Sequence, residues 1–234
     1  MSEEQETQVV GDQSSIITAG QMQRFWQQVG DGSVTKNTFQ AFLEHRNPFA
    51  ITDIGAEWQE FYRKYFLLNI DFSGVVIPDD PGGFERVIFI PKGLIFAHVI
   101  KMLYEQFMVF PSVKDPATEV TRNVRTPEPS YAIRIRDRQE ADDELKLLSA
   151  IQLKEQGINC ITLLEHLVFT LKYWSETNEH LDLNISTLCP SFHCSGGDVS
   201  CVGWDLEDCG LRINWYESGR ASELLRARQA VSLT

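Results

Sequence analysis

Helical spacing of apolar residues marks the first half of the chain. The segments 18–29 (TAGQMQRFWQQV) and 34–46 (VTKNTFQAFLEHR) each place apolar residues three or four positions apart and contain a threonine, Thr18 or Thr35, that can cap a helix. The same spacing recurs in 57–68 (EWQEFYRKYFLL) and 93–107 (GLIFAHVIKMLYEQF). We therefore predict four helices here, with their aromatic residues packed in a core rather than around a ligand.

Strand patterns separate these helices and follow them. The segments 73–78 (SGVVIP) and 86–91 (RVIFIP) are short apolar runs ended by proline, and 130–136 (SYAIRIR) alternates apolar with polar residues. Two helices are expected next, over 139–157 and 162–178, the second opening with Thr162 and Glu165 in capping-box spacing. His166, within this second helix, is expected at the surface or an edge rather than as a ligand.

A period of two returns near the end of the chain. The segments 199–205 (VSCVGWD) and 211–217 (LRINWYE) alternate, which predicts two strands with a shared apolar inner face built around Trp204 and Trp215. Their outer faces would carry Cys201, Gly203 and Asp205 on one strand and polar residues on the other. The alternation of residues 227, 229 and 231 predicts a closing strand.

These patterns predict an α+β protein with two folded parts. Residues 1–16 are polar and acidic and are expected to form a disordered tail. Residues 17–112 would form a small α+β adaptor domain, and 113–129, rich in proline and threonine, a linker. Residues 130–234 would form the C-terminal domain, in the order strand, two helices, irregular loop, strands and final strand.

The charge balance changes the picture of possible partners. A formal net charge of −12, with no cluster of lysine and arginine, argues against a nucleic-acid partner. The first residues lack the basic and apolar regions of a signal peptide, and no apolar run is long enough to cross a bilayer. We therefore expect a cytoplasmic protein with reduced cysteines and no membrane span, although display at the surface through a partner stays open.

Four of the five cysteines fall between residues 189 and 210, and this cluster raises the question of a metal site. A zinc-stabilised domain or hydrolase could use soft ligands from this segment; the candidates are Cys189, His193, Cys194, Cys201 and Cys209. The spacing of the cysteines is wider than in usual zinc knuckles, and the neighbouring acids disfavour a reactive thiolate. A calcium site built from Asp198, Asp205 and Asp208 would need oxygen ligands that no EF-hand spacing supplies. We expect no enzyme, no metal and no cofactor.

Several segments are similar to a known family. The run 130–191, from SYAIRIR to LCPS, together with VGW, LRINWY and LRARQAVS, resembles proteins common in small-genome candidate-phyla bacteria, and EWQEFYRKYFLLNIDFSGVVIP resembles the preceding part of that family. The order of elements from Tyr131 is also similar to the C-type-lectin fold. The resemblance implies a variable protein of a diversity-generating retroelement, which rewrites adenines near the 3′ end of its target gene. The calcium-sugar triplet of true lectins is absent, and CPSFHC and DLEDCG depart from the family pattern.

The resemblance implies a set of variable contact residues. Adenine replacement in an AAC codon yields fifteen amino acids but not Trp, Lys, Met, Gln or Glu. The outer positions all fall within that set; they are Phe192, His193, Cys194, Asp198, Cys201, Gly203, Asp205, Asn214, Tyr216, Arg220 and Ser222. Trp204 and Trp215 lie outside it and are expected to be scaffold.

The resulting expectation is a binding protein that holds interchangeable contacts on a rigid framework, as antibody loops do. Its ligand would be an unknown protein or surface group. The alternatives are the zinc-stabilised domain or hydrolase and an acidic regulator or toxin neutraliser. The sequence names neither the ligand nor the oligomeric state, and it gives no mechanism for the N-terminal part.

Overall fold

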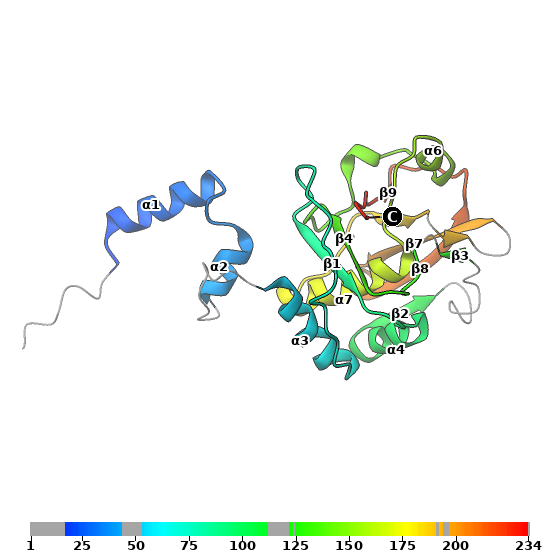
Figure 1. Ribbon diagram of the computed structural model, residues 1–234. Helices are drawn as coiled ribbons and strands as arrows, with labels where there is room; N and C mark the ends of the chain where they lie inside the picture. The colour runs from blue at the N-terminus through cyan, green and yellow to red at the C-terminus, as the bar shows by residue number, and fades with distance from the viewer. Residues whose placement is uncertain are drawn as a thin grey trace, which may run out of the picture. The chain divides into compact units, whose positions relative to one another are not determined.

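The chain divides into two compact units, residues 1–52 and 53–234, which we call the helical unit and the body (Figure 1). The computed structural model describes residues 17–43, 53–111, 122–123, 125–190, 192–193 and 197–233. The expected disordered tail, 1–16, lies outside the described residues. No helix in the described ranges is long and apolar enough to cross a membrane.

Two helices form the described part of the helical unit, α1 (Ala19–Gly30) and α2 (Lys36–Leu43). The Thr18 hydroxyl accepts from the Gln21 backbone N–H, and the Gln21 side chain accepts from the Thr18 N–H, so a capping box starts α1 as its threonine predicted. The Thr38 N–H donates to the Thr35 hydroxyl at the start of α2. Both predicted helices are confirmed.

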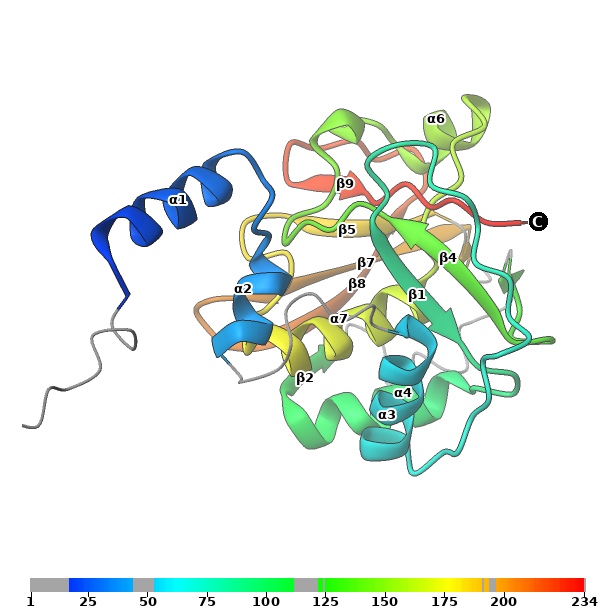
Figure 2. The ribbon, with the colours of Figure 1, turned by 60° about the vertical axis from the view of Figure 1, so that its left-hand side comes forward.

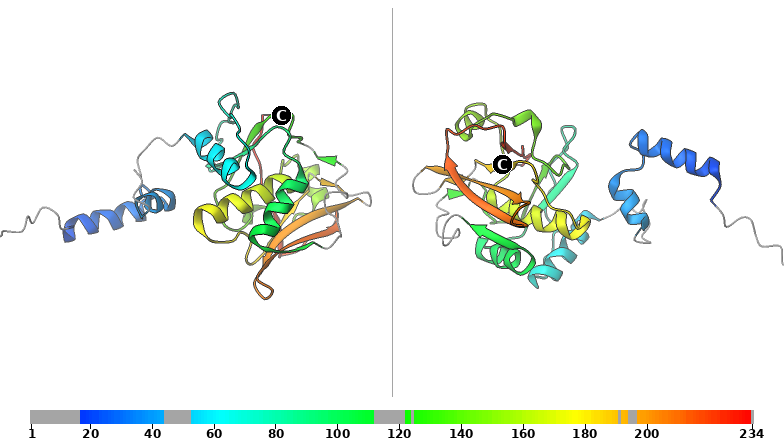
Figure 3. Two further views of the ribbon diagram at one scale, coloured as in Figure 1. Left: turned by 90° about the horizontal axis from the view of Figure 1, so that it is seen from below. Right: turned by 180° about the vertical axis from the view of Figure 1, so that it is seen from behind.

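A five-stranded mixed sheet organises the body, in the order β2-β8-β7-β5-β9 (Figure 2). Its strands are β2 (Met108–Pro111), β5 (Ser186–Cys189), β7 (Asp198–Asp205), β8 (Gly210–Glu217) and β9 (Leu225–Ala227). β7 and β8 form a long antiparallel hairpin (Figure 3), whereas β2–β8 and β5–β9 are parallel pairs. Two further pairs are antiparallel: β1 (Arg86–Ile90) with β4 (Tyr131–Ile135), and β3 (Arg122–Asn123) with β6 (Phe192–His193). The α+β class is confirmed.

Helix α7 (Leu163–Thr177) runs between the sheet and the β1–β4 pair, with α3 (Ile54–Phe66) and α4 (Phe96–Gln106) beside it (Figure 1). It is buried from Leu163 through Tyr173. The Thr162–Glu165 capping box is present as predicted, because Glu165 accepts from the Thr162 N–H at 2.7 Å. The apolar side chains of α7 account for its burial at the centre of the body, and the capping box satisfies backbone N–H groups at its buried start.

The two faces of the sheet pack against different cores. Alternate side chains point to opposite faces, so Val202 and Ile213 join the main core with α7 and β1. On the other face Val199 and Cys201 join a second, smaller core. The 3₁₀ helix η2 (Asp143–Leu145) and α6 (Ala150–Glu155) cover that face through Leu145, Ala150 and Leu153.

The predicted division of the chain at residues 113–129 is wrong. Strand β1 pairs along its whole length with β4, so segments on both sides of the proposed linker form one sheet. Arg125 is 7 % exposed and donates two hydrogen bonds of 2.7 Å to Glu165 on α7. The described part of the linker is therefore anchored in the body, and the compact unit begins at Asp53.

The predicted helix over 139–157 is also wrong, because it breaks into η2 and α6. Asp142 is fully buried, where its carboxylate accepts from Arg136 at 2.6 Å and from the Gln229 N–H at 2.7 Å. Leu147 has a positive φ of 63°, which a continuous helix excludes. The predicted strand 73–78 has no strand pairing in the described residues.

His166, predicted at the surface or an edge, is 1 % exposed on α7. Its Nε2 lies 3.2 Å from an Asp182 carboxylate oxygen, and Arg228 donates to the other oxygen at 2.6 Å. Thr187 donates to Asp182 as well. This buried network connects α7, β5 and the segment after β9. The prediction of a surface or edge position for His166 is therefore wrong, because its side chain is part of the interior.

Candidate binding site

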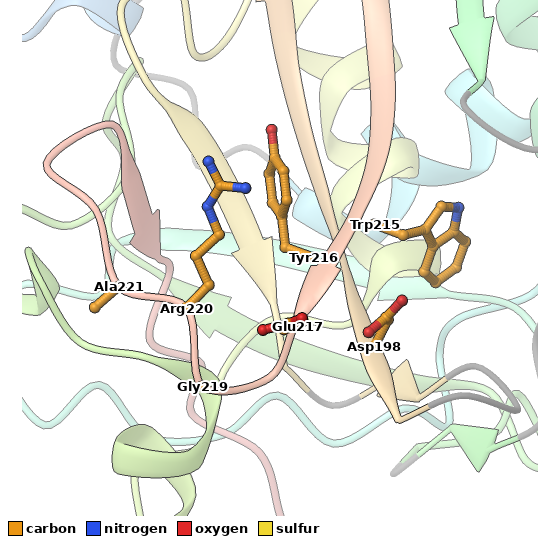
Figure 4. A pocket seen from close by; sticks show the side chains of 7 residues that line it. All are labelled: Asp198, Trp215, Tyr216, Glu217, Gly219, Arg220 and Ala221. Atoms are coloured by element: carbon orange, nitrogen blue, oxygen red, sulfur yellow. The ribbon is translucent and has the colours of Figure 1, made fainter.

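A hollow of about 540 Å³ lies where β7 begins and β8 ends (Figure 4). Its wall comes from the first residue of β7, the last three residues of β8 and the turn that follows. The lining residues are Asp198, Trp215, Tyr216, Glu217, Gly219, Arg220 and Ala221. Three of them, Asp198, Tyr216 and Arg220, are among the contact residues predicted from the sequence.

The turn after β8 holds Arg220 against Tyr216. The Arg220 N–H donates to the Glu217 carbonyl at 2.9 Å, and the Ser218 carbonyl accepts from the Ile151 N–H of α6 at 3.2 Å. The Arg220 guanidinium lies over the Tyr216 ring, 4.0 Å from its centroid (Figure 4). Stacking of this kind fixes a flexible side chain and leaves its N–H donors free at the edge. Arg220 forms no ion pair with any described residue.

Two carboxylates face each other across the strands. Asp198 pairs directly with Glu217 in the β7–β8 register, and their side chains therefore leave the same face of the sheet. Trp215 lies on that face too, two positions from Glu217. Neither carboxylate forms an ion pair with a described residue. Like charges directly opposite are unfavourable by themselves, so this side of the hollow suits a positively charged group.

The hollow therefore offers both signs of charge beside two aromatic rings. The guanidinium and Tyr216 lie on one side of β8 and Asp198 and Trp215 on the other, with Glu217 at the end of the strand (Figure 4). Such a mixture supports recognition of a polar partner surface. Its described lining residues include no serine, cysteine, histidine or lysine side chain.

Two predicted contact residues are not available for contact. Cys201 is 1 % exposed in the second core, where burial raises the pKa of its thiol to about 12. Gly203 is buried, and a Cβ there would lie 2.6 Å from the Ser186 hydroxyl and 3.1 Å from the Ile185 carbonyl oxygen. The predicted outer face is thus partly an interior one, because η2 and α6 cover it at Cys201 and the neighbouring strand β5 crowds Gly203.

Asp205 belongs to a self-contained hairpin turn. It accepts from the backbone N–H groups of Glu207 and Asp208 at 2.9 Å and from the Arg212 guanidinium, which also binds the Asp208 carboxylate. The hydrogen bond from Asp208 and then the one from Arg212 lower the pKa of Asp205. Its carboxylate is therefore engaged within the turn and far along β7 from Asp198.

Asn214 and Ser222 do not line the hollow, and the other predicted contacts lie in or beside the segment 191–196, of which the structure describes only the backbone of residues 192–193. Asn214 is half-buried opposite Cys201, and the Ser222 hydroxyl accepts from the Leu224 N–H within its own turn. Phe192 and His193 form the short strand β6, whose backbone pairs with β3. Cys194 lies outside the described residues.

The described cysteines do not converge on one point. Cys189 belongs to the main core and Cys201 to the second core, on opposite faces of the sheet, and burial raises both thiol pKa values. Cys209 is exposed in the hairpin turn. Among the described residues no three His, Cys, Asp or Glu side chains form a metal-binding group. Asp198 and Asp205 stand at opposite ends of β7, which separates the acids considered for calcium.

The two tryptophans predicted as scaffold differ in their surroundings. Trp204 stacks on His180 with 3.4 Å between ring centroids, and Phe107 meets both rings edge-on. Trp215 packs against the main core and also lines the hollow. Glu217, Gly219 and Ala221 also line the hollow, but the sequence did not single them out. The codon set excludes glutamate, and the turn that contains Gly219 and Ala221 has no periodic apolar pattern that would mark it as part of a site.

Searches of protein-family models, curated proteins and solved structures gave no match to this chain.

Proposed function

We propose that the body is a binding domain with a C-type-lectin-like fold, whose contact surface includes the hollow at the end of β8. The observation that carries this proposal is that Asp198, Tyr216 and Arg220, from a strand start, a strand end and a turn, line one hollow. Each presents a polar group beside an aromatic ring, which is a common composition for protein-binding surfaces.

The order of elements supports the fold. Strand β4 comes first, then η2, α6 and α7, then the hairpin sheet, and the chain returns beside β4 through the antiparallel bridge between Arg134 and Val231. A return of the last segment to the first strand is what the resemblance implies. The hydrogen bonds Arg134 N–H to Val231 O and Val231 N–H to Arg134 O are both 2.9 Å.

The rigid support behind the hollow favours binding over catalysis. Tyr216 packs on the second core, Trp215 on the main core, and the turn is held by α6. A fixed wall with exchangeable polar groups allows the partner to change while the fold persists. Diversification by a retroelement would act on this wall at Asp198, Tyr216 and Arg220, and not at buried Cys201 or Gly203.

Sequencing the DNA around the gene tests diversification directly. We expect a near-copy of the segment encoding residues 189–228 beside a reverse-transcriptase gene, with differences confined to adenines of the copy. Codons 198, 216 and 220 should be among the differing ones, and codons 204 and 215 should be identical. A genome with neither the copy nor the reverse transcriptase would contradict diversification.

A displayed library tests the binding surface independently. Positions 198, 216 and 220 would be randomised together and selected against a purified protein such as serum albumin. A matched library would randomise Glu60, Arg63 and Lys64, which are exposed on α3. Binders from the first library alone would support the hollow as a contact surface, whereas equal yields from both would overturn that assignment.

A further inference from the structure

The hollow at the end of β8 continues onto helix α6. Gly219 has no side chain, and a Cβ at that position would lie 3.8 Å from the Cδ1 atom of Ile151. Ile151 is 46 % exposed, and its N–H donates to the Ser218 carbonyl of the turn that lines the hollow. A large apolar side chain is therefore held at a fixed place directly beside the charged wall.

The two carboxylates of the hollow contribute no ion pair to the fold. Asp198 and Glu217 are direct partners in the β7–β8 register, and neither forms an ion pair with any residue in the described part of the chain. Like charges directly opposite each other destabilise a strand pair. A cation from outside would relieve this repulsion and would gain charge-assisted hydrogen bonds.

Trp215 is a second feature that suits a cation. Its ring lies on the same side of β8 as Asp198 (Figure 4), and the main core supports it from behind. Tryptophan attracts cations to its ring face more strongly than the other aromatic side chains do. The stem of a lysine or arginine is apolar, so it can cover such a ring while its charged end reaches a carboxylate.

The other side of the hollow offers a donor. Arg220 lies over the Tyr216 ring, 4.0 Å from its centroid, and its guanidinium can donate to a carbonyl or carboxylate of a partner. A bare metal ion would not span Asp198, Arg220 and Ile151 at once. A cation, an acceptor and an apolar group within one ligand are instead what a short polypeptide segment supplies.

We propose that the hollow takes a lysine or arginine side chain of a polypeptide partner, whose charged end binds Asp198 and Glu217. Its stem packs on Trp215, an acceptor beside it binds Arg220, and a neighbouring apolar residue packs on Ile151. The net charge of −12 attracts such a basic segment from a distance. The inference rests on the proposed function, because it names the partner of the same hollow.

Selection from a displayed library of random peptides tests the inference. The full-length protein and the double variant Asp198→Asn, Glu217→Gln would be used in parallel, in buffer with a chelator. Peptides selected on the unchanged protein should carry lysine or arginine next to an apolar residue. Their affinity for the double variant should fall by about tenfold or more, because charge-assisted contacts are lost.

A matched control separates the hollow from the general acidity of the chain. Asp79→Asn, Glu85→Gln changes the net charge by the same amount at two exposed acids outside the hollow, and should bind the selected peptides like the unchanged protein. Ile151→Ser should weaken binding without changing the requirement for a basic residue. Raising the salt from about 0.1 M to about 1 M should weaken binding too, since the screening length falls from about 10 Å to about 3 Å.

Nuclear magnetic resonance of the backbone amides of residues 217–221 shows where a selected peptide binds. Peptides that shift these amides but lack a basic residue, or that bind the double variant equally well, would overturn the inference and leave the proposed function standing. Saturation of the same amides by calcium alone would assign the carboxylates to a metal ion and would also overturn it. Failure to obtain any peptide that shifts these amides would overturn it and would count against the hollow as a contact surface.

Discussion

Arg125 and Glu165, forty positions apart, form a two-bond ion pair in which the two side chains are 7 % and 0 % exposed. Tyr131 donates to the same carboxylate at 2.9 Å, and burial together with that carboxylate raises the pKa of Tyr131 well above its ordinary range. Glu165 also accepts from the Thr162 N–H. One carboxylate thus fastens the segment before β4, strand β4 itself and the start of α7.

Removing Arg125 should therefore destabilise the body severely. Arg125→Met leaves Glu165 buried without its cation, and breaking a buried pair in this way costs about 3–5 kcal/mol. Urea denaturation followed by tryptophan fluorescence measures the change. Arg138→Gln is the matched control, because its pair with Glu144 is half-exposed and should contribute at most about 1 kcal/mol. Equal losses for the two variants would contradict the role assigned to Arg125.

A cavity in α7 gives the second prediction. Leu167 is fully buried in the main core, so Leu167→Ala should lower the free energy of unfolding by about 2–5 kcal/mol. Leu206→Ala removes the same atoms from a side chain that is 60 % exposed and should change stability by less than about 0.5 kcal/mol. Thermal or urea unfolding compares the two, and a similar effect of both would place α7 outside the core.

The close approach of β7 to β5 gives the third prediction. Gly203→Ala should destabilise by about 1–3 kcal/mol, because the added methyl group meets Ser186 and the rigid backbone at Ile185. Gly74→Ala, where the added methyl group would meet nothing within 4 Å, should be neutral or slightly stabilising. A tolerated alanine at 203 would return this position to the candidates for diversification.

The fourth prediction concerns pH. Burial lowers the pKa of His166 below its ordinary 6.5, although Asp182 opposes the shift. Above pH 6.5 the imidazole is neutral in both the folded and the unfolded chain, so stability does not depend on it. Below that value the unfolded chain takes up a proton that the folded chain resists, and the free energy of unfolding should fall as pH drops.

Urea unfolding at a series of pH values from about 7 to about 5 measures this slope. His166→Gln should flatten it, whereas His180→Gln should flatten it less, because His180 is only half-buried and loses less solvation than the fully buried His166. A slope unchanged by His166→Gln would mean that the folded protein accepts the proton readily.

Local pattern was sufficient to predict α7 and the β7–β8 hairpin. Helix α7 combines apolar residues on most sides with a capping box, and both signals lie within one stretch of sequence. The alternation in β7 and β8 likewise required no distant partner. The body as one unit could not be predicted in this way, because it depends on β1 pairing with β4 across the segment that reads as a linker.

One wrong element also explains the errors at the candidate site. The helical spacing of 139–157 predicts one continuous helix, but Asp142 is buried and bonds to Arg136 and to the Gln229 N–H, 87 positions away. The segment therefore folds over the sheet as η2 and α6 and covers Cys201. Asp198, Tyr216 and Arg220 nevertheless line the hollow at the ends of β7 and β8, although Tyr216 also packs against the second core, and for them a contact role stays a prediction.

Arg228 has a consequence for how the body is made. Its guanidinium donates to the carbonyls of Arg138 and Gln139 and to buried Asp182, so the hydrogen bonding of these groups is complete only when residue 228 is in place. A growing polypeptide on the ribosome reaches that residue after nearly all of the body has been synthesised. Folding of the body is then completed only after the segment around β9 has been synthesised, so this segment belongs to the folding unit and is not an addition to a finished domain.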